Sequence, residues 1–169
     1  MKLIVISSPS AVPNEHEIIN SLFEEGLEVF HIHKPDFSKE QIKDFIQKIS
    51  SKYHSRIAQH SDFPKFHSLK KLEDCKEKYE YAFLSPIFDS ISKSVYKSKF
   101  NFQELKNSPL LRWDAAVIAL GGIDEDKIET CREIGFTGVA VLGAIWQNGN
   151  PLEKYKRLKF LCQKKDLVF

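Results

Sequence analysis

Short apolar runs alternate with amphipathic stretches along most of the chain. The runs expected to form strands are residues 3–7, 27–33, 56–60, 81–85, 115–120 and 138–142. Between them lie segments with apolar side chains at helical spacing, of which residues 42–49 are the clearest. Strands that alternate with helices are typical of an α/β fold with a parallel sheet, and this is the fold class that we predict.

Capping residues indicate where several of the helices begin and end. Asn14 and Glu17 have the spacing of a capping box, and so do Ser38 and Gln41. Gly26 follows the first of these helices and is expected to end it. Further helices are predicted over residues 69–78 and 102–106, from residue 125 onward and from about residue 151 onward.

Composition and charge limit the classes of partner. The net charge of +2 over 169 residues predicts neither a nucleic-acid nor a membrane partner, and the length fits one domain. No apolar run reaches the roughly 18 residues that a membrane span needs. The cysteines Cys75, Cys131 and Cys162 have no CxxC spacing. We therefore expect neither disulfides nor a cysteine metal site, and we expect a cytoplasmic protein.

Two predicted strands near the C-terminal end of the chain run directly into glycine. Residues 115–120 are followed by Gly121 and Gly122, and residues 138–142 are followed by Gly143. The carboxyl ends of parallel strands meet at one edge of a sheet, where free backbone N–H groups can hold a phosphate. Glycine lets the backbone approach an anion closely, because it has no Cβ atom. These positions predict a phosphate site; the alternative is tight packing of a strand-to-helix turn.

A polar loop follows the predicted strand at residues 81–85. Within it, Ser90, Ser92 and Lys93 offer two hydroxyls and an ammonium close together. Such a group can bind phosphate or pyrophosphate through charge-assisted hydrogen bonds. The alternative is a solvated basic loop.

Histidines lie at or near the ends of three predicted strands. His31 and His33 share one face of the second strand, and Lys34 follows them. No third metal ligand follows from the sequence, so phosphate contact, substrate contact and packing remain open for this pair beside metal binding. His60 and His67 are candidates for an acid or base near neutral pH, or for a structural role.

Three segments together resemble the thiamine phosphate synthase family, including its thiazole tautomerase (TenI-like) branch. They are residues 84–93, 119–123 and 138–145, and they occur in the order and approximate spacing of the family. The resemblance implies a single TIM-barrel domain of (β/α)₈ type over residues 1–169. Compared with the family, roughly one and a half to two βα units are missing between His60 and His67, which predicts a truncated barrel.

The resemblance also implies a reaction and a set of site residues. The family's synthase couples a pyrimidine pyrophosphate to a thiazole phosphate; pyrophosphate leaves first, and the thiazole nitrogen captures the pyrimidine cation. The catalytic residues implied here are Lys93 and His67. The phosphate-binding residues implied are Gly121, Gly122, Gly143, Ser90, Ser92, Lys93, Lys34, His33 and His31.

Departures from the family concern its metal site. Mg²⁺ is expected for the family, which holds the ion with aspartates. Here His60 and Ser61 stand at the first aspartate position, with Asp62 one step out of register, and the second aspartate is missing. His33 replaces an arginine of the family. We therefore assign no metal ligand. His67 matches the histidine that the tautomerase branch uses as acid and base.

These observations leave three functions open. The chain is expected to act as a thiamine phosphate synthase of thiamine biosynthesis, as a tautomerase that uses His67, or as a non-catalytic binder of a phosphorylated ligand of that pathway. The expected ligands are a phosphorylated thiazole or thiamine phosphate. A second copy of the chain is a possible partner, because the missing strands expose sheet edges that a homodimer could cover.

Overall fold

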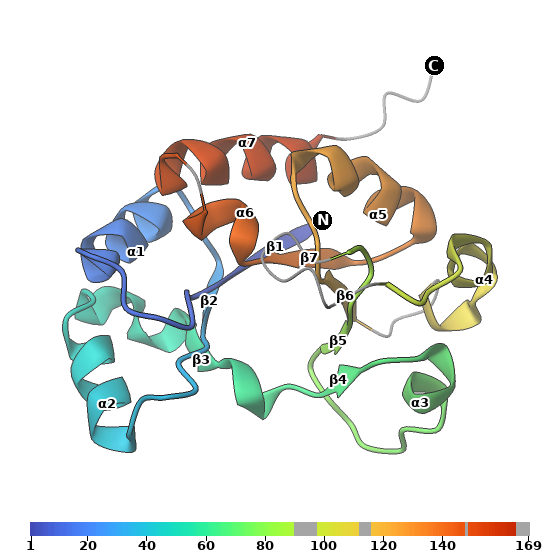
Figure 1. Cartoon of the computed structure of the whole chain (residues 1–169), viewed down its shortest axis with the longest axis horizontal. Helices are drawn as coiled ribbons and strands as arrows, with labels where there is room; N and C mark the ends of the chain where they lie inside the picture. The colour runs from blue at the N-terminus through green and yellow to red at the C-terminus, as the bar shows by residue number, and fades with distance from the viewer. Residues whose placement is uncertain (90–97, 112–115, 148, 165–169) are drawn as a thin grey trace.

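The computed structural model describes residues 1–89, 98–111, 116–147 and 149–164, and it contains one parallel sheet of seven strands. The strands are β1 (Lys2–Ile6), β2 (Val29–Ile32), β3 (Ile57–Gln59), β4 (Lys65–Phe66), β5 (Ala82–Leu84), β6 (Val117–Leu120) and β7 (Gly138–Val141). Their order across the sheet is β3-β2-β1-β7-β6-β5-β4. The sheet curls into an open barrel with its gap between β3 and β4 (Figure 1).

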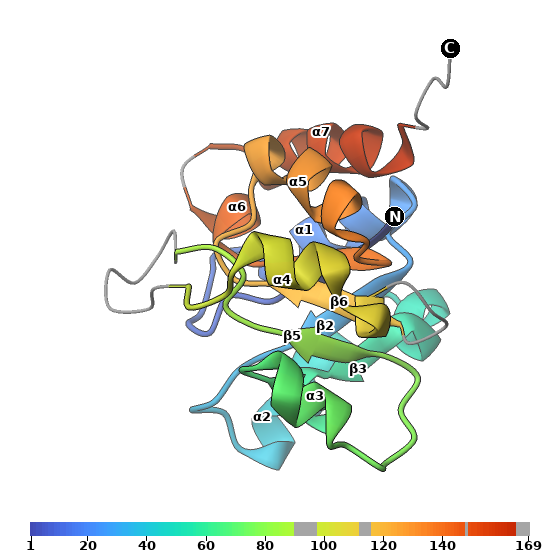
Figure 2. The ribbon, with the colours of Figure 1, turned by 90° about the vertical axis from the view of Figure 1, so that its right-hand side faces the viewer.

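Helices cover the outer side of the sheet. They are α1 (Glu15–Glu24), α2 (Lys39–Gln47), α3 (Leu69–Glu73), α4 (Phe102–Asn107), α5 (Ile128–Ile134), α6 (Gly143–Trp146) and α7 (Pro151–Gln163). Short 3-10 turns are η1 (Ser51–Arg56), η2 (His60–Asp62), η3 (Pro109–Leu111) and η4 (Glu125–Lys127). The helices α5 and α7 pack side by side (Figure 1, Figure 2). No helix in the described parts of the chain is long and apolar enough to cross a membrane.

The truncated barrel predicted from the sequence is confirmed. A closed barrel of this type has eight strands, whereas this sheet has seven, and its edge strands β3 and β4 are only three and two residues long. The first and last strands still pair, with Lys2 opposite Gly138 and Val5 opposite Val141. The opening therefore lies in the middle of the chain, where η2 and two further residues connect β3 to β4.

Aromatic side chains fill the interior of the curled sheet beside the gap. A buried cluster without helix residues contains Ile4, Ile6, Tyr81, Phe83, Ile118 and Ala140, which identifies it as the inner face. The ring of Phe63, from the segment that crosses the gap, stacks on Tyr81 with centroids 4.4 Å apart. The same ring lies 4.7 Å from His31. These contacts cover apolar surface that the missing strand would otherwise bury.

Two predicted helix features differ in the structure. Asn14 precedes α1 in a left-handed conformation with φ 54°, and its side chain makes no capping hydrogen bond. The prediction of a capping box at Asn14 and Glu17 is therefore wrong. The box of Ser38 and Gln41 is confirmed. The helix predicted over residues 69–78 ends at Glu73. The residues that follow are mostly polar, so a further turn has little apolar surface to pack against the sheet.

Candidate functional site

The structure brings the two glycine-ended strands together. β6 and β7 are neighbours in the sheet, with Leu120 opposite Ala140. Gly121 and Gly122 follow β6, and Gly143 begins α6 just after β7. β5 pairs with the other side of β6, so the connection that follows it reaches the same edge of the sheet. Three connections at adjacent carboxyl ends thus form the region where barrel proteins usually hold phosphate.

Gly121 and Gly122 are required by the packing of this region. Both have left-handed backbones, with φ of 97° and 66°. A Cβ atom on Gly121 would lie 2.8 Å from Pro86 Cα, and one on Gly122 would lie 2.1 Å from the carbonyl oxygen of Asp89. The amide of Phe88 also donates to the carbonyl of Gly121 at 3.1 Å. The packing interpretation is therefore confirmed for both residues, while their role in phosphate binding stays a prediction.

Gly143 differs from this pair in its backbone. It is the first residue of α6, and its φ is not among the left-handed values. The indole Nε1 of Trp146 donates to the carbonyl of Ile6 at 2.7 Å, which ties α6 to the carboxyl end of β1. The first amides of a helix have no partner within the helix, so those of Gly143 and Ala144 are available to a ligand just after the end of β7.

A buried chain of polar rings lies inside the barrel. His31 Nε2 is 2.6 Å from the hydroxyl of Tyr81, and His31 Nδ1 is 3.3 Å from His60 Nδ1. A hydrogen bond between two Nδ1 atoms requires that one of them carries no proton, so the two rings cannot both be charged while they keep this bond. Burial lowers the pKa of His31 to about 4 and that of His60 to about 3. Burial also raises the pKa of Tyr81 to about 12.

Two further basic side chains lie near His60. The ring of His33 is 5.5 Å from the ring of His60, and the backbone amide of His33 donates to Ser7 Oγ at 2.8 Å. The ammonium of Lys65 is close enough to repel a charge on His60, and partial desolvation lowers the pKa of Lys65 itself. Sequence reasoning missed Lys65, which begins β4 two residues before His67.

Lys34 has a buried partner inside the protein. Its Nζ atom lies 2.5 Å from Glu15 Oε2 and donates to the carbonyl of Ser10 at 2.8 Å. The lysine side chain is fully buried, and 4% of the Glu15 side chain is exposed. The same ammonium lies over the rings of Phe37 and Phe45. Lys34 could therefore contact a phosphate only after this pair separates.

One ring nitrogen of His67 makes a hydrogen bond to the backbone. Its Nδ1 atom lies 2.7 Å from the carbonyl oxygen of Ser85. A carbonyl only accepts hydrogen bonds, so Nδ1 carries the proton and donates. In the neutral ring Nε2 then has a free lone pair, and the side chain is exposed. This geometry suits an acid or base that exchanges a proton at Nε2.

The hydroxyl and ammonium groups of Ser90, Ser92 and Lys93 lie outside the described residues. The two described residues nearest to this segment are connected, because the amide of Ser98 donates to Asp89 Oδ1 at 2.8 Å. The predicted roles of the three residues in phosphate binding and catalysis stay predictions.

The donor groups at these strand ends do not fit Mg²⁺. Within residues 1–89, 98–111, 116–147 and 149–164, no group of three or more His, Cys, Asp or Glu side chains could hold a metal ion. His33, His60 and His67 follow or end β2, β3 and β4, whereas Mg²⁺ prefers carboxylate and phosphate oxygens. We therefore derive no step through a metal held by this chain.

Comparison with known proteins gives a consistent assignment. No family model matches the chain. A thiamine-phosphate synthase of Limosilactobacillus reuteri (strain DSM 20016) is 26% identical over 82 residues, which is 48% of this chain and 38% of that protein. The chain thus matches less than half the length of this curated relative.

Solved structures extend the likeness to nearly the whole chain. The thiamine phosphate pyrophosphorylase of Bacteroides thetaiotaomicron is 29% identical, with a TM-score of 0.77 over 95% of this chain and 97% of that one. The pyrophosphorylase of Pyrococcus furiosus shares the fold at 16% identity, with a TM-score of 0.74 over 95% of each chain. Together with the open barrel and its glycine-ended strands, these matches make the chain similar to thiamine phosphate synthase/TenI-like proteins.

Proposed function

We propose that the chain is a thiamine phosphate synthase-like protein that couples a pyrimidine pyrophosphate to a thiazole phosphate. The observation that carries the proposal is the adjacency of the two glycine-ended strands β6 and β7, in a chain similar to these proteins. In the proposal, the thiazole phosphate lies at Gly122 and at the first amides of α6. The pyrophosphate lies against Ser90, Ser92 and Lys93.

The chemistry needs a site that favours charge separation. The bond between the pyrimidine's reacting carbon and pyrophosphate breaks, and pyrophosphate leaves with the electron pair. The nitrogen of the thiazole then donates its lone pair to the cation and forms the new bond. The aromatic rings of Phe63, Tyr81 and Phe83 fill the barrel below the strand ends. They support the proposal because packed aromatic rings exclude water, and their faces favour a nearby cation.

A substitution at Gly143 tests the proposed site. Gly143→Asp places a carboxylate at the start of α6, where it repels the thiazole phosphate, and the φ of Gly143 is one that other residues adopt. We expect purified protein to release pyrophosphate when it is given both substrates. In Gly143→Asp the KM for thiazole phosphate should rise at least about tenfold.

Gly143→Ala is the matched control and should keep a KM close to that of the unmodified protein. Folded protein that releases no pyrophosphate from both substrates, with or without added Mg²⁺, would contradict the synthase. Thermal stabilisation by thiamine phosphate then decides whether the chain is a binder, because a ligand of the native state raises Tm.

A tautomerase is the second candidate, and the hydrogen bond from His67 Nδ1 to the Ser85 carbonyl favours it. This bond fixes the tautomer and leaves Nε2 as a base for a proton on the thiazole ring. The reaction moves a proton within one substrate, so it needs neither pyrophosphate nor a metal. It would use the same phosphate site at the ends of β6 and β7.

His67→Asn separates the two candidates. If His67 is the acid and base of a tautomerase, the substitution should lower kcat about 10²-fold or more, with little change in the KM for the phosphorylated thiazole. NMR detection of proton exchange on the thiazole ring measures this rate. His54→Asn is the control, since His54 belongs to η1 on the outer side of the sheet. An unchanged exchange rate in His67→Asn excludes the proposed role.

A further inference from the structure

Basic side chains lie on both sides of the gap in the sheet. His60 directly follows β3, and Lys65 begins β4 (Figure 1). Lys65 pairs in register with Phe83, which belongs to the cluster on the inner face, so the two side chains point to the same face of the sheet. The ring of Phe83 also lies 4.8 Å from the ring of His60. Lys65 and His60 therefore flank the gap on the inner face of the barrel.

The positive charge at this place has no counter-charge. Among the described residues, the charges that act on His60 all come from basic side chains, namely Lys65, His31 and His33. Desolvation lowers the pKa of Lys65, and no carboxylate of the described residues opposes that shift. Lys65 is nevertheless exposed, because the sheet is open beside β4. A partly desolvated ammonium that lacks a counter-charge favours an anion at its side.

His60 contributes a ring nitrogen that a ligand can reach. Its Nδ1 atom faces His31, whereas its Nε2 atom has no hydrogen-bond partner among the described residues. In that part of the chain, the side-chain nitrogen or oxygen that is both fully buried and without a partner is Oε1 of Glu15. The Nε2 atom of His60 therefore keeps some accessible surface, although only 6% of the residue is exposed.

The buried polar rings decide whether this nitrogen carries a proton. Burial raises the pKa of Tyr81 to about 12, so its hydroxyl keeps its proton and can donate to His31 Nε2 at 2.6 Å. His31 Nδ1 then carries a proton and donates to His60 Nδ1, which leaves the proton of the neutral His60 ring on Nε2. In this arrangement His60 is a hydrogen-bond donor toward the gap without being charged.

We propose that Lys65 and His60 form a metal-independent site for the pyrophosphate group of the substrate. The ammonium of Lys65 supplies the counter-charge, and the Nε2–H group of His60 donates a hydrogen bond. These donors do not fit Mg²⁺, but they fit the anion that Mg²⁺ would otherwise bind. The inference rests on the proposed synthase function, because it names the groups that stabilise the leaving pyrophosphate of that reaction.

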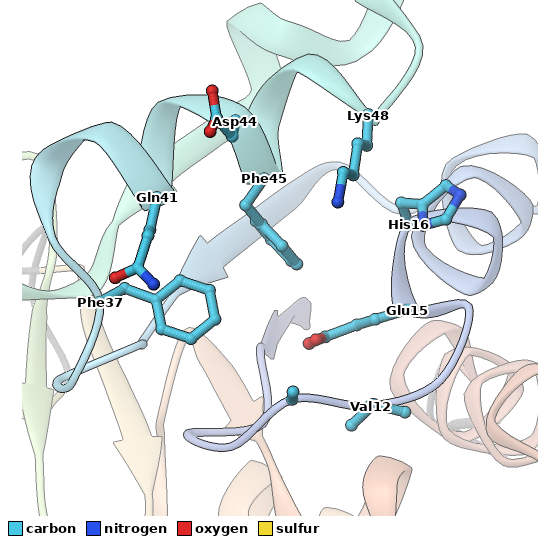
Figure 3. Close-up of a pocket in the computed structure, with 9 residues that line it drawn as sticks. Val12, Glu15, His16, Phe37, Gln41, Asp44, Phe45 and Lys48 are labelled. Carbon is cyan, nitrogen blue, oxygen red and sulfur yellow. The ribbon is translucent and has the colours of Figure 1, made fainter.

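Calorimetric titration of inorganic pyrophosphate into the purified chain, with EDTA present, tests the site. We expect binding, and Lys65→Met should weaken it about tenfold or more. Lys48→Met is the matched control and should bind as the unmodified chain does. Lys48 is also exposed and also lines a cavity, but that cavity lies between α1 and α2 and has Glu15 and Asp44 in its wall (Figure 3). Thermal unfolding confirms that both variants fold.

The effect of Mg²⁺ has an expected sign. The ion binds pyrophosphate in solution, lowers its negative charge and occupies oxygens that the side chains would contact. The affinity for pyrophosphate should therefore fall when excess Mg²⁺ replaces EDTA. A site that used bridging Mg²⁺ would show the opposite change.

NMR detects the proton on His60 independently of turnover. Long-range ¹H–¹⁵N spectra distinguish the two tautomers of a neutral imidazole, and His60→Gln identifies the signals of this ring. With pyrophosphate bound, we expect the proton on Nε2. A proton on Nδ1 of His60 in the complex, binding that requires Mg²⁺, or equal affinity in Lys65→Met and the unmodified chain would each overturn the proposal.

These outcomes are separate from those that test the synthase. Pyrophosphate binding in EDTA that depends on Lys65 supports the site even if the chain releases no pyrophosphate from its two substrates. Turnover in a chain that binds pyrophosphate only with Mg²⁺ supports the synthase and overturns the site.

Discussion

Replacing Lys34 with methionine should destabilise the protein by about 3–5 kcal/mol, because it leaves the buried carboxylate of Glu15 without its counter-charge. The two groups are 2.5 Å apart and almost completely buried. Burial already raises the pKa of Glu15, and Lys34 opposes that rise. Without the lysine, the carboxylate must either stay charged in an apolar setting or take up a proton, and both cost free energy. Urea denaturation at pH 7 measures the change.

A double-mutant cycle isolates the pair. Glu15→Leu combined with Lys34→Met removes both charges, and the double variant should recover to within about 2 kcal/mol of the unmodified protein. Lys106→Met is the control, since Lys106 pairs with Glu133 at 3.1 Å on the surface. We expect it to cost less than about 1 kcal/mol. If Lys34→Met lowers the free energy of unfolding by no more than Lys106→Met does, the inference that the buried pair stabilises the protein is wrong.

Acid should destabilise the protein already as the pH falls below about 6.5. The folded state lowers the pKa of His31 and His60 below their usual value near 6.5. The unfolded chain therefore binds protons that the folded state does not, and the free energy of unfolding falls as the pH drops below about 6.5. At pH 5 the loss is about 2 kcal/mol for each imidazole. The contribution is fully present above that range and lost progressively toward the lower folded pKa values.

Denaturation curves at pH 7 and pH 5 measure this effect. His60→Gln should reduce the difference in unfolding free energy between the two pH values, because glutamine does not titrate. His16→Gln serves as the control, since His16 lies in α1 with its side chain 36% exposed. An equal pH dependence in His60→Gln and in the unmodified protein would show that the buried rings are not responsible.

The sequence was informative where an element has a local pattern. Most residues of β1, β2, β6 and β7 are apolar and each strand has four or five residues, so these strands are visible without tertiary information. The adjacency of the glycine-ended strands followed from their being consecutive parallel strands. β4 has only two residues, Lys65 and Phe66, and two residues cannot display an alternation.

Contacts between distant residues could not be predicted. Lys34 was predicted to contact phosphate, and nothing in the sequence indicates that it pairs with Glu15. Only the packing of α1 against the loop after β2 buries the two side chains together. The contact of His31 with Tyr81 joins residues 50 positions apart, and no spacing rule relates them. The same holds for Phe63, whose place in the barrel gap depends on the strand that is missing.

The position of the gap gives the sheet a particular relation to the order of the chain. Across the sheet from β4 to β3, the strands read β4, β5, β6, β7, β1, β2, β3. A circular permutant that began at the gap would therefore have every strand beside its neighbour in sequence. The new connection would run from the end of α7 to β1, where the amino group of Met1 already donates to the carbonyl of Cys162 at 2.9 Å. In the present order, β1 can pair with β2 early, but its other side stays unpaired until β7 has been synthesised.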